Sequence, residues 1–407
     1  MEHLSPARCG AARRPWLPRL LIAFMACGAC MARAQDATPY VPARDDVVLQ
    51  RVPPRTDPRV RQFDTLRAAV AAKPGDVAVA VALAHAYIDY GRSTGDARYL
   101  GRAMAVIEPF MRTATPPVPV ALAHATILQS RHAFNEARAE LEAVLRRDPD
   151  SAQGWLTLAS VAMVQGDYAA ANHACVQLAN AAGGFMGQVC SASLRSLDGH
   201  APQAYALLTM IEDPGPRAPP DIRAWIEGLM ADTAARMGKP DVADGHFRSA
   251  LRWAPGDNFL LADYGEFLLD QGRAAEALTL VAGDTQSDTS FLVRVRAEAM
   301  LGLPAAAIDT ATMDARFADM ARRGDHLFLR EQADFLLHIH HDAAAALALA
   351  ELNWKTQRAP KDARVFLEAA LAAGQPRAAA PVIAFVAASG MSDPTIDPLV
   401  AKVKAQP

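Results

Sequence analysis

A short proline-containing pattern closes several segments of this chain at regular intervals, and it restricts the folds that the chain can adopt. The pattern is a pair of small or aliphatic residues, three further residues, a proline and a nearby aspartate. It occurs at Pro74, Pro149 and Pro255, with a weaker copy at Pro360. The intervals of 75, 106 and 105 residues are each two or three units of about 34 residues with a small remainder, as loop insertions would leave. The sequence therefore predicts an array of repeats.

The repeated units are predicted to be helical. Ala- and Leu-rich stretches recur with apolar residues three and four positions apart, whereas the period-two alternation that indicates strands is scarce. Hydrophobic residues make up 51% of the chain and charged residues 21%, which is typical of a folded protein and excludes a disordered or multi-span membrane protein. The formal charge of −3 provides no basic excess for nucleic acid. We expect an all-α protein with no nucleic-acid partner.

Residues inside the units recur at fixed positions. The unit that begins at Ala152 has a large Trp155 at position 4 and Gly166 at the turn between its two helices. Small residues, Ala159 and Ala171, stand at positions 8 and 20. Much of this pattern recurs in the units that begin at Val118, Ala224 and Asn258. It resembles the tetratricopeptide repeat (TPR), whose small residues allow the two helices of a unit to touch. The resemblance implies a right-handed α-solenoid of antiparallel helix pairs, a TPR-like superhelix.

The resemblance also suggests how the chain is organised. Residues 59–72 are expected to form a lone capping helix, and the following unit carries about five extra residues in its inter-helix turn, at 91–96. The expected segments are a signal peptide at 1–34, a proline-rich lead-in at 35–58, an N-terminal block of about four repeats plus the capping helix at 59–212, a proline-rich loop at 213–220, and a C-terminal block of about four to five repeats at 221–407, the last ones degenerate and closed by a capping helix.

The segment 1–34 has the features of an export signal. Arg13, Arg14 and Arg19 form a positive region before a short apolar stretch at 20–29, which is too short to span a bilayer. Ala32 and Ala34 supply the small residues that a signal peptidase needs, so cleavage is expected after Ala34. These features predict a periplasmic protein whose mature chain has no transmembrane domain. Lipidation of Cys27 is the alternative, although the surrounding residues match a lipobox poorly.

Removal of the leader would leave two cysteines, Cys175 and Cys190. An even pair in an exported chain favours a disulfide. Residues 181–184 read as a turn between two helices, and the two cysteines are almost equidistant from its centre. Equidistant residues on the facing sides of an antiparallel helix pair can approach each other, as a disulfide requires. We therefore expect a Cys175–Cys190 bond.

Eleven histidines raise the question of a metal or catalytic site. The densest group is His338, His340 and His341, in which His338 and His341 are three residues apart and could bind a metal ion weakly from one helix face. No cysteine or carboxylate spacing completes a metal signature, and solvated histidines are the commoner case at a helix end. The sequence contains no nucleophile elbow, phosphate loop or HExxH motif. We expect no enzymatic activity, no catalytic residues and no cofactor.

Proteins that resemble this family usually bind a peptide or a partner helix in a concave groove formed by the first helix of each unit. In the best-formed pair of units, the groove residues would be Trp225, Asp232, Phe259, Glu266 and Asp270. Aromatic rings beside carboxylates suit a protein segment with apolar and basic side chains. Alternatively, the two aromatic residues only cover neighbouring helices.

These features indicate a non-catalytic scaffold or adaptor in the bacterial periplasm, with a protein or peptide as its partner. The first alternative is a maturation or metallochaperone helper that docks an apoprotein, to which His338, His340 and His341 would contribute. The second alternative is a membrane-tethered lipoprotein adaptor attached through Cys27.

Overall fold

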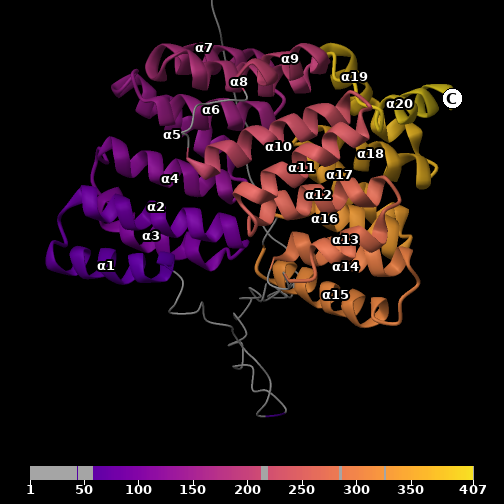
Figure 1. Ribbon diagram of the computed structural model, residues 1–407, viewed down its shortest axis with the longest axis horizontal. Helices are drawn as coiled ribbons and strands as arrows, with labels where there is room; N and C mark the ends of the chain where they lie inside the picture. The colour runs from indigo at the N-terminus through magenta and orange to yellow at the C-terminus, as the bar shows by residue number, and fades with distance from the viewer. Residues whose placement is uncertain (1–43, 45–57, 212–218, 284–286, 325–326, 407) are drawn as a thin grey trace, which may run out of the picture. The chain divides into compact units, whose positions relative to one another are not determined.

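The computed structural model describes residues 44, 58–211, 219–283, 287–324 and 327–406. All of the described helices belong to one compact unit, within Pro53–Pro407. Within the described residues every regular element is a helix (Figure 1). Among the described helices, none has the length and apolarity that crossing a membrane requires. The predicted signal peptide at 1–34, Cys27 and most of the segments 35–58 and 213–220 lie outside the described residues.

The helices of the N-terminal half are α1 (Pro58–Ala72), α2 (Val77–Thr94), α3 (Arg98–Met111), α4 (Val118–Ser130), α5 (Phe134–Arg147), α6 (Ala152–Val164), α7 (Tyr168–Ala182), α8 (Gly184–Leu197) and α9 (Ala201–Ile211). Those of the C-terminal half are α10 (Pro220–Arg236), α11 (Pro240–Trp253), α12 (Asn258–Asp270), α13 (Ala274–Leu280), α14 (Asp288–Met300), α15 (Ala306–Arg322), α16 (Leu329–Phe335), the π-helix η1 (Leu336–His340), α17 (Ala343–Trp354), α18 (Pro360–Ala372), the 3₁₀-helix η2 (Pro376–Ala379), α19 (Ala380–Ser389) and α20 (Asp397–Ala405).

Consecutive helices pack against each other in pairs, and the pairs recur at the predicted interval. The starts of α4 and α6 are separated by one repeat unit of about 34 residues, as are the starts of α5 and α7 and those of α11 and α13. The small residues at the repeat positions are fully buried between the helices, among them Ala125, Ala137, Ala171, Ala231 and Ala243. Close packing of helices requires small side chains at their contact, which explains why alanine recurs there. The prediction of an all-α solenoid of helix pairs is confirmed.

The proline-aspartate pattern marks the junction between one pair and the next. Asp76 is the N-cap of α2, where its carboxylate accepts hydrogen bonds from the backbone N–H groups of Ala78 and Val79. Asp257 caps α12 in the same way by accepting from the N–H of Leu260. Each cap satisfies backbone donors that a helix start leaves unpaired. The pattern therefore ends one helix and begins the next.

The extra residues at 91–96 differ from the expectation of a longer turn. Residues 91–94 are helical and extend α2 to 18 residues, whereas α4 and α6 each have 13. The helix ends at Gly95, whose φ of 68° is left-handed and suits glycine. A Cβ added to Gly95 would lie 3.0 Å from the Cβ of Ser287, which precedes α14. The insertion thus carries the end of α2 into contact with a distant repeat.

Two further contacts join segments that are distant in the sequence. The backbone N–H of Arg358, after α17, donates to the carbonyl oxygen of Val164 at 2.7 Å. A Cβ on Gly199, before α9, would clash with the carbonyl oxygen of Gly390, which ends α19. Figure 1 shows α19 beside α9. A simple array of repeats needs only neighbour contacts, so these contacts are an additional feature of this chain.

Helices α7 and α8 are joined by a disulfide between Cys175 and Cys190, whose Cα atoms are 5.4 Å apart. Gly183 is the single residue between the two helices. Gly187 lies against Ala179 so closely that a Cβ at that position would clash with it. The small residues therefore bring the helix axes together at the point where the disulfide forms.

Candidate functional site

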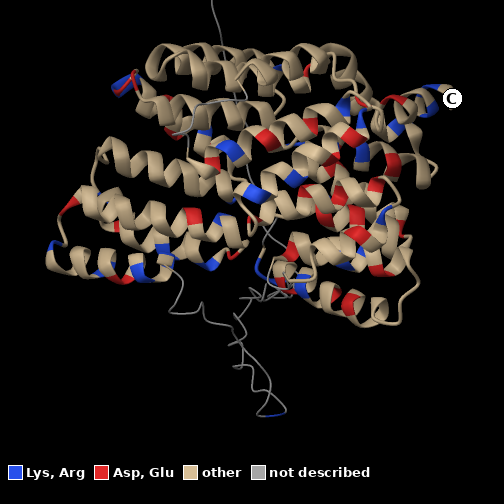
Figure 2. Cartoon of the chain, viewed as in Figure 1, with Lys and Arg blue, Asp and Glu red and all other residues tan. Residues whose placement is uncertain are grey.

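The first helices of the C-terminal repeats face one another through charged side chains. We call this set the ion-pair network, and it comprises Asp263, Glu266 and Asp270 on α12, Arg330 and Asp334 on α16, His338 on η1, and Lys361, Arg364 and Glu368 on α18. Figure 2 shows acidic and basic residues interspersed over this part of the chain.

Lys361 and Arg364 carry the contacts that cross from α18 to α12. The Nζ atom of Lys361 lies 2.7 Å from a carboxylate oxygen of Asp263 and 2.5 Å from one of Glu266. The guanidinium of Arg364 lies 2.5 Å from the carboxylate of Asp270. A third cation, Arg330, lies 3.4 Å from Glu266. Two of the predicted groove residues, Glu266 and Asp270, are therefore already paired with cations of the same chain.

In the ion-pair network, attraction between opposite charges opposes the unfavourable effect of burial on the charged groups. Burial alone would raise the pKa of Glu266, but the positive charges of Lys361 and Arg330 lower it well below its ordinary value. Burial likewise acts to lower the pKa of Lys361, while Asp263 and Glu266 raise it above its ordinary value. Both groups therefore stay charged at neutral pH, and each stabilises the other in the folded state.

Asp232 on α10 is the least compensated carboxylate beside the network. Its nearest cation is Arg236 at 3.9 Å, and its side chain is 36% exposed. Burial raises the pKa of Asp232, and the negative charges of Asp263 and Glu266 act in the same direction. Asp232 lines a cavity of about 290 Å³ together with Glu266 and Asp270. The structure thus brings these three predicted groove residues to one small, charged cavity.

The two aromatic residues of the predicted groove lie outside the lining of this cavity. Trp225 is half-buried and packs against a cluster that contains Leu208 and Met230. Phe259 is 53% exposed. Trp225 therefore does cover a neighbouring helix, whereas Phe259 presents much of its ring to solvent.

The histidines near residue 340 lie where the helix changes character. The chain forms the π-helix η1, and His341 then has a left-handed backbone with a φ of 57°. His338 lies 3.5 Å from Asp334 and 3.4 Å from Glu368, while His341 is exposed. His340 contacts Asp314 on α15 at 2.8 Å. Within the described ranges, no group of three or more histidine, cysteine or acidic residues is arranged to hold a metal ion.

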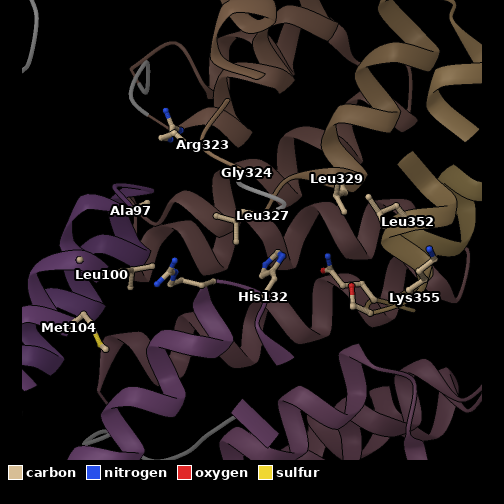
Figure 3. A pocket seen from close by; sticks show the side chains of 14 residues that line it. Ala97, Leu100, Met104, His132, Arg323, Gly324, Leu327, Leu329, Leu352 and Lys355 are labelled. Atoms are coloured by element: carbon tan, nitrogen blue, oxygen red, sulfur yellow. The ribbon is translucent and has the colours of Figure 1, made fainter. Parts of the chain in front are cut away.

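A larger cavity, of about 850 Å³, lies where α3 meets three inter-helix turns (Figure 3). We call it the turn cavity. The turns are those after α4, after α15 and after α17. In Figure 3, Leu100 and Met104 approach from α3, and Leu329 and Leu352 approach from the C-terminal repeats. Leu100 and Leu329 are buried, whereas Leu352 is 39% exposed. The turn cavity therefore has an apolar floor, with the side chain of Leu352 exposed at its edge.

The rim of the turn cavity is basic. Arg131, Arg323 and Lys355 line it and are exposed, and His132 is a further lining residue. Among the described residues, no ion pair engages these three cations, and no lining residue is acidic. Sequence reasoning missed this site because its lining comes from separate segments that are far apart in the sequence. No local motif marks such residues.

Comparison with known proteins gives likeness of fold alone. No protein-family profile matches the sequence, and no curated protein matches it significantly. Among solved structures, PilW, described as a widely conserved type IV pilus biogenesis factor, is similar at 14% identity and a TM-score of 0.40, over 50% of this chain and 96% of PilW. A tetratricopeptide repeat protein from Parabacteroides merdae is similar at 14% identity and a TM-score of 0.38, over 63% of this chain and 93% of that protein. Human IFIT1, in a dimer with m7Gppp-AAAA, is similar at 11% identity and a TM-score of 0.47, over 81% of this chain and 86% of IFIT1.

These likenesses assign no function. The fold assignment rests on the molecule itself, in which helix pairs recur at a regular interval around buried alanines. The chain is an α-solenoid of the tetratricopeptide-repeat type.

Proposed function

We propose that the protein is an exported, non-catalytic adaptor that holds a segment of a partner protein in the turn cavity. The observation that carries this proposal is the cavity itself, about 850 Å³ in volume and lined by apolar side chains that are partly open to solvent. Its size lies in the upper part of the range of cavities that bind ligands, about 300–1,000 Å³. Contact with a partner would remove the exposed apolar surface of Leu352 from water.

Because of the ion pairs, we place the partner segment in the turn cavity and not in the groove predicted on α10 and α12. A basic partner segment would have to displace Lys361 from Glu266 and Arg364 from Asp270 before it could use these carboxylates. Displacing one cation by another exchanges similar interactions and brings little net gain. The apolar floor of the turn cavity requires no such exchange.

Export is supported by two independent features. The Cys175–Cys190 disulfide fits a protein that folds in an oxidising compartment, such as the periplasm. The features of residues 1–34 favour a cleaved signal peptide. Mass spectrometry of the protein recovered from an envelope fraction tests this part of the proposal: a chain that begins at Gln35 supports it, a lipid-modified chain that begins at Cys27 indicates the exported lipoprotein instead, and an uncleaved chain contradicts export.

The adaptor proposal is tested by affinity capture from an envelope extract, using the disulfide-intact protein. The cavity variant Met104→Ser/Leu352→Ser removes apolar surface from the α3 side and from the C-terminal side of the turn cavity. The matched control is Phe259→Ser, which removes exposed apolar surface from the predicted groove. Thermal melting first establishes that both variants are folded.

We expect the wild type and the Phe259→Ser control to capture the same protein, and the cavity variant to lose it. If the cavity variant still captures the protein and Phe259→Ser does not, the binding site lies in the predicted groove. Equal capture by all three proteins would contradict both locations.

A further inference from the structure

The cations of the turn cavity differ from those of the ion-pair network. In the network, Lys361 and Arg364 each contact two carboxylates at 2.9 Å or less. At the turn cavity, Arg131 and Lys355 have no ion pair among the described residues, although they come from turns of different repeats that are distant in the sequence. The folded chain gathers these positive charges around an apolar floor without supplying negative charges from the described lining.

We propose that the turn cavity selects an acidic protein segment with interleaved apolar side chains; this inference rests on the proposed adaptor function and names the chemistry of the partner. Apolar side chains of the segment contact the floor formed by Leu100, Met104 and Leu329. Its carboxylates lie at the rim, within reach of Arg131 and Lys355. Charge complementarity of this kind speeds association and selects among partners.

The openness of the rim favours a protein segment over a small amphiphile. A small ligand in a protein pocket commonly has about 70–90% of its surface buried. Here the rim cations and Leu352 are exposed, so only the floor can be shielded completely. An extended segment can lay alternate side chains on the floor and continue past the rim, whereas a small molecule would keep one face in water. The turn cavity therefore suits a peptide as its occupant.

The test uses two fluorescein-labelled, acetylated peptides, one of alternating Glu and Leu and the other of alternating Lys and Leu. Binding to the full disulfide-intact protein is measured by fluorescence anisotropy at low and at physiological salt. The charge-reversal variant is Arg131→Glu/Lys355→Glu. Its control is Lys402→Glu/Lys404→Glu, which reverses two exposed cations in the last turn of α20 and so matches the variant in its effect on a helix C terminus.

We expect the acidic peptide to bind the wild type more tightly than the basic peptide. Its affinity should fall by about tenfold in Arg131→Glu/Lys355→Glu and stay within about twofold of wild type in the α20 control. The preference should weaken with added salt, because the rim charges are exposed. The neutral variant Arg131→Gln/Lys355→Gln, expected to lie between wild type and the reversal, replaces the reversal if the latter melts at a lower temperature.

Four results would overturn the inference. Equal affinity for the two peptides, or no binding of either at millimolar concentration, excludes an acidic segment as the occupant. Binding of decanoate that is lost in the charge-reversal variant, without binding of the acidic peptide, assigns the cavity to a small anionic amphiphile. Failure of this inference alone is recognised in the capture experiment: a partner that is lost from Met104→Ser/Leu352→Ser but kept by the charge-reversal variant retains the adaptor function and removes the acidic chemistry.

Discussion

Lys361 and Glu266 are 95 residues apart in the sequence, yet the Nζ atom of one lies 2.5 Å from a carboxylate oxygen of the other. The pair joins α18 to α12, which belong to different repeats. Arg364 and Asp270 form a second ion pair between α18 and α12, one helical turn further along both helices. The C-terminal repeats are therefore held together by charges as well as by the apolar contacts between neighbouring helices.

Removal of Lys361 should destabilise the fold. In Lys361→Met, Glu266 keeps only Arg330 at 3.4 Å and Asp263 loses its cation. Breaking a fully buried pair costs about 3–5 kcal/mol. Because the Lys361 side chain is 41% exposed, we expect a smaller loss of about 1–2 kcal/mol in the free energy of unfolding. Urea unfolding measures it, with the exposed Lys402→Met as control, and equal stabilities of the two variants would contradict the network.

The stability contributed by Glu266 should depend on pH. Its pKa is lowered in the folded protein, so the folded state binds fewer protons than the unfolded chain as pH falls below the ordinary glutamate value of about 4.3. The contribution is complete above that value and is lost as pH falls towards the lowered pKa.

Glu266→Gln should therefore be less stable than wild type at pH 7, and the difference should shrink as pH falls below about 4. Chemical unfolding at a series of pH values measures this. Glu108→Gln, at an exposed pair with Arg112, provides the control and should show a small difference at every pH. A difference for Glu266→Gln that stays constant with pH would show that its carboxylate is not held ionised by the network.

Because Gly199 contacts Gly390, replacement of Gly199 should destabilise the fold more than replacement of Gly272. Gly199 and Gly272 both have left-handed backbones, with φ of 85° and 71°. A Cβ meets the carbonyl oxygen of Gly390 at the first position and nothing within 4 Å at the second. We expect Gly199→Ala to lose about 1–3 kcal/mol more than Gly272→Ala, because only the former must also displace α19. Equal losses in thermal or urea unfolding would mean that α19 does not pack against this turn.

The disulfide between α7 and α8 should contribute measurable stability. It closes a loop with a sequence separation of 15 residues. In the chain-entropy account, a loop of this size is worth about 3 kcal/mol. Cys175→Ser/Cys190→Ser should lose about this much, and reduction of the wild type should lower its stability to the same level. Added reductant should leave the double variant unchanged, and a wild type indifferent to reductant would contradict the prediction.

Much of the fold could be predicted from the sequence, because the residues that specify it lie close together in the chain. The regular recurrence of helix pairs follows from alanines at fixed spacing, since those positions must be small for two helices to touch. The proline and aspartate between units have equally local roles, as Asp76 and Asp257 show by capping α2 and α12. The pattern at 91–96 predicts a longer turn, whereas the structure continues α2 to Thr94. These residues could also continue a helix, and the contact of Gly95 with Ser287 lies far outside any local window.

The candidate site was harder to predict from the sequence, because it depends on contacts between residues that are far apart in the chain. Repeat positions indicated which side chains of α10 and α12 share a face, but they could not show that Lys361 and Arg364 would reach Glu266 and Asp270. Nor could they indicate a cavity whose lining includes both Leu100 and Leu352.

The sequence alone determined the repeating unit, its helical content and its caps, because each depends on residues within about one repeat of one another. Tertiary structure alone decided which carboxylates are already paired and where a cavity with a basic rim and an apolar floor opens. Those outcomes depend on the geometry with which the successive repeats stack on one another. Small rotations at each repeat accumulate along a solenoid, and their sum sets which distant side chains meet.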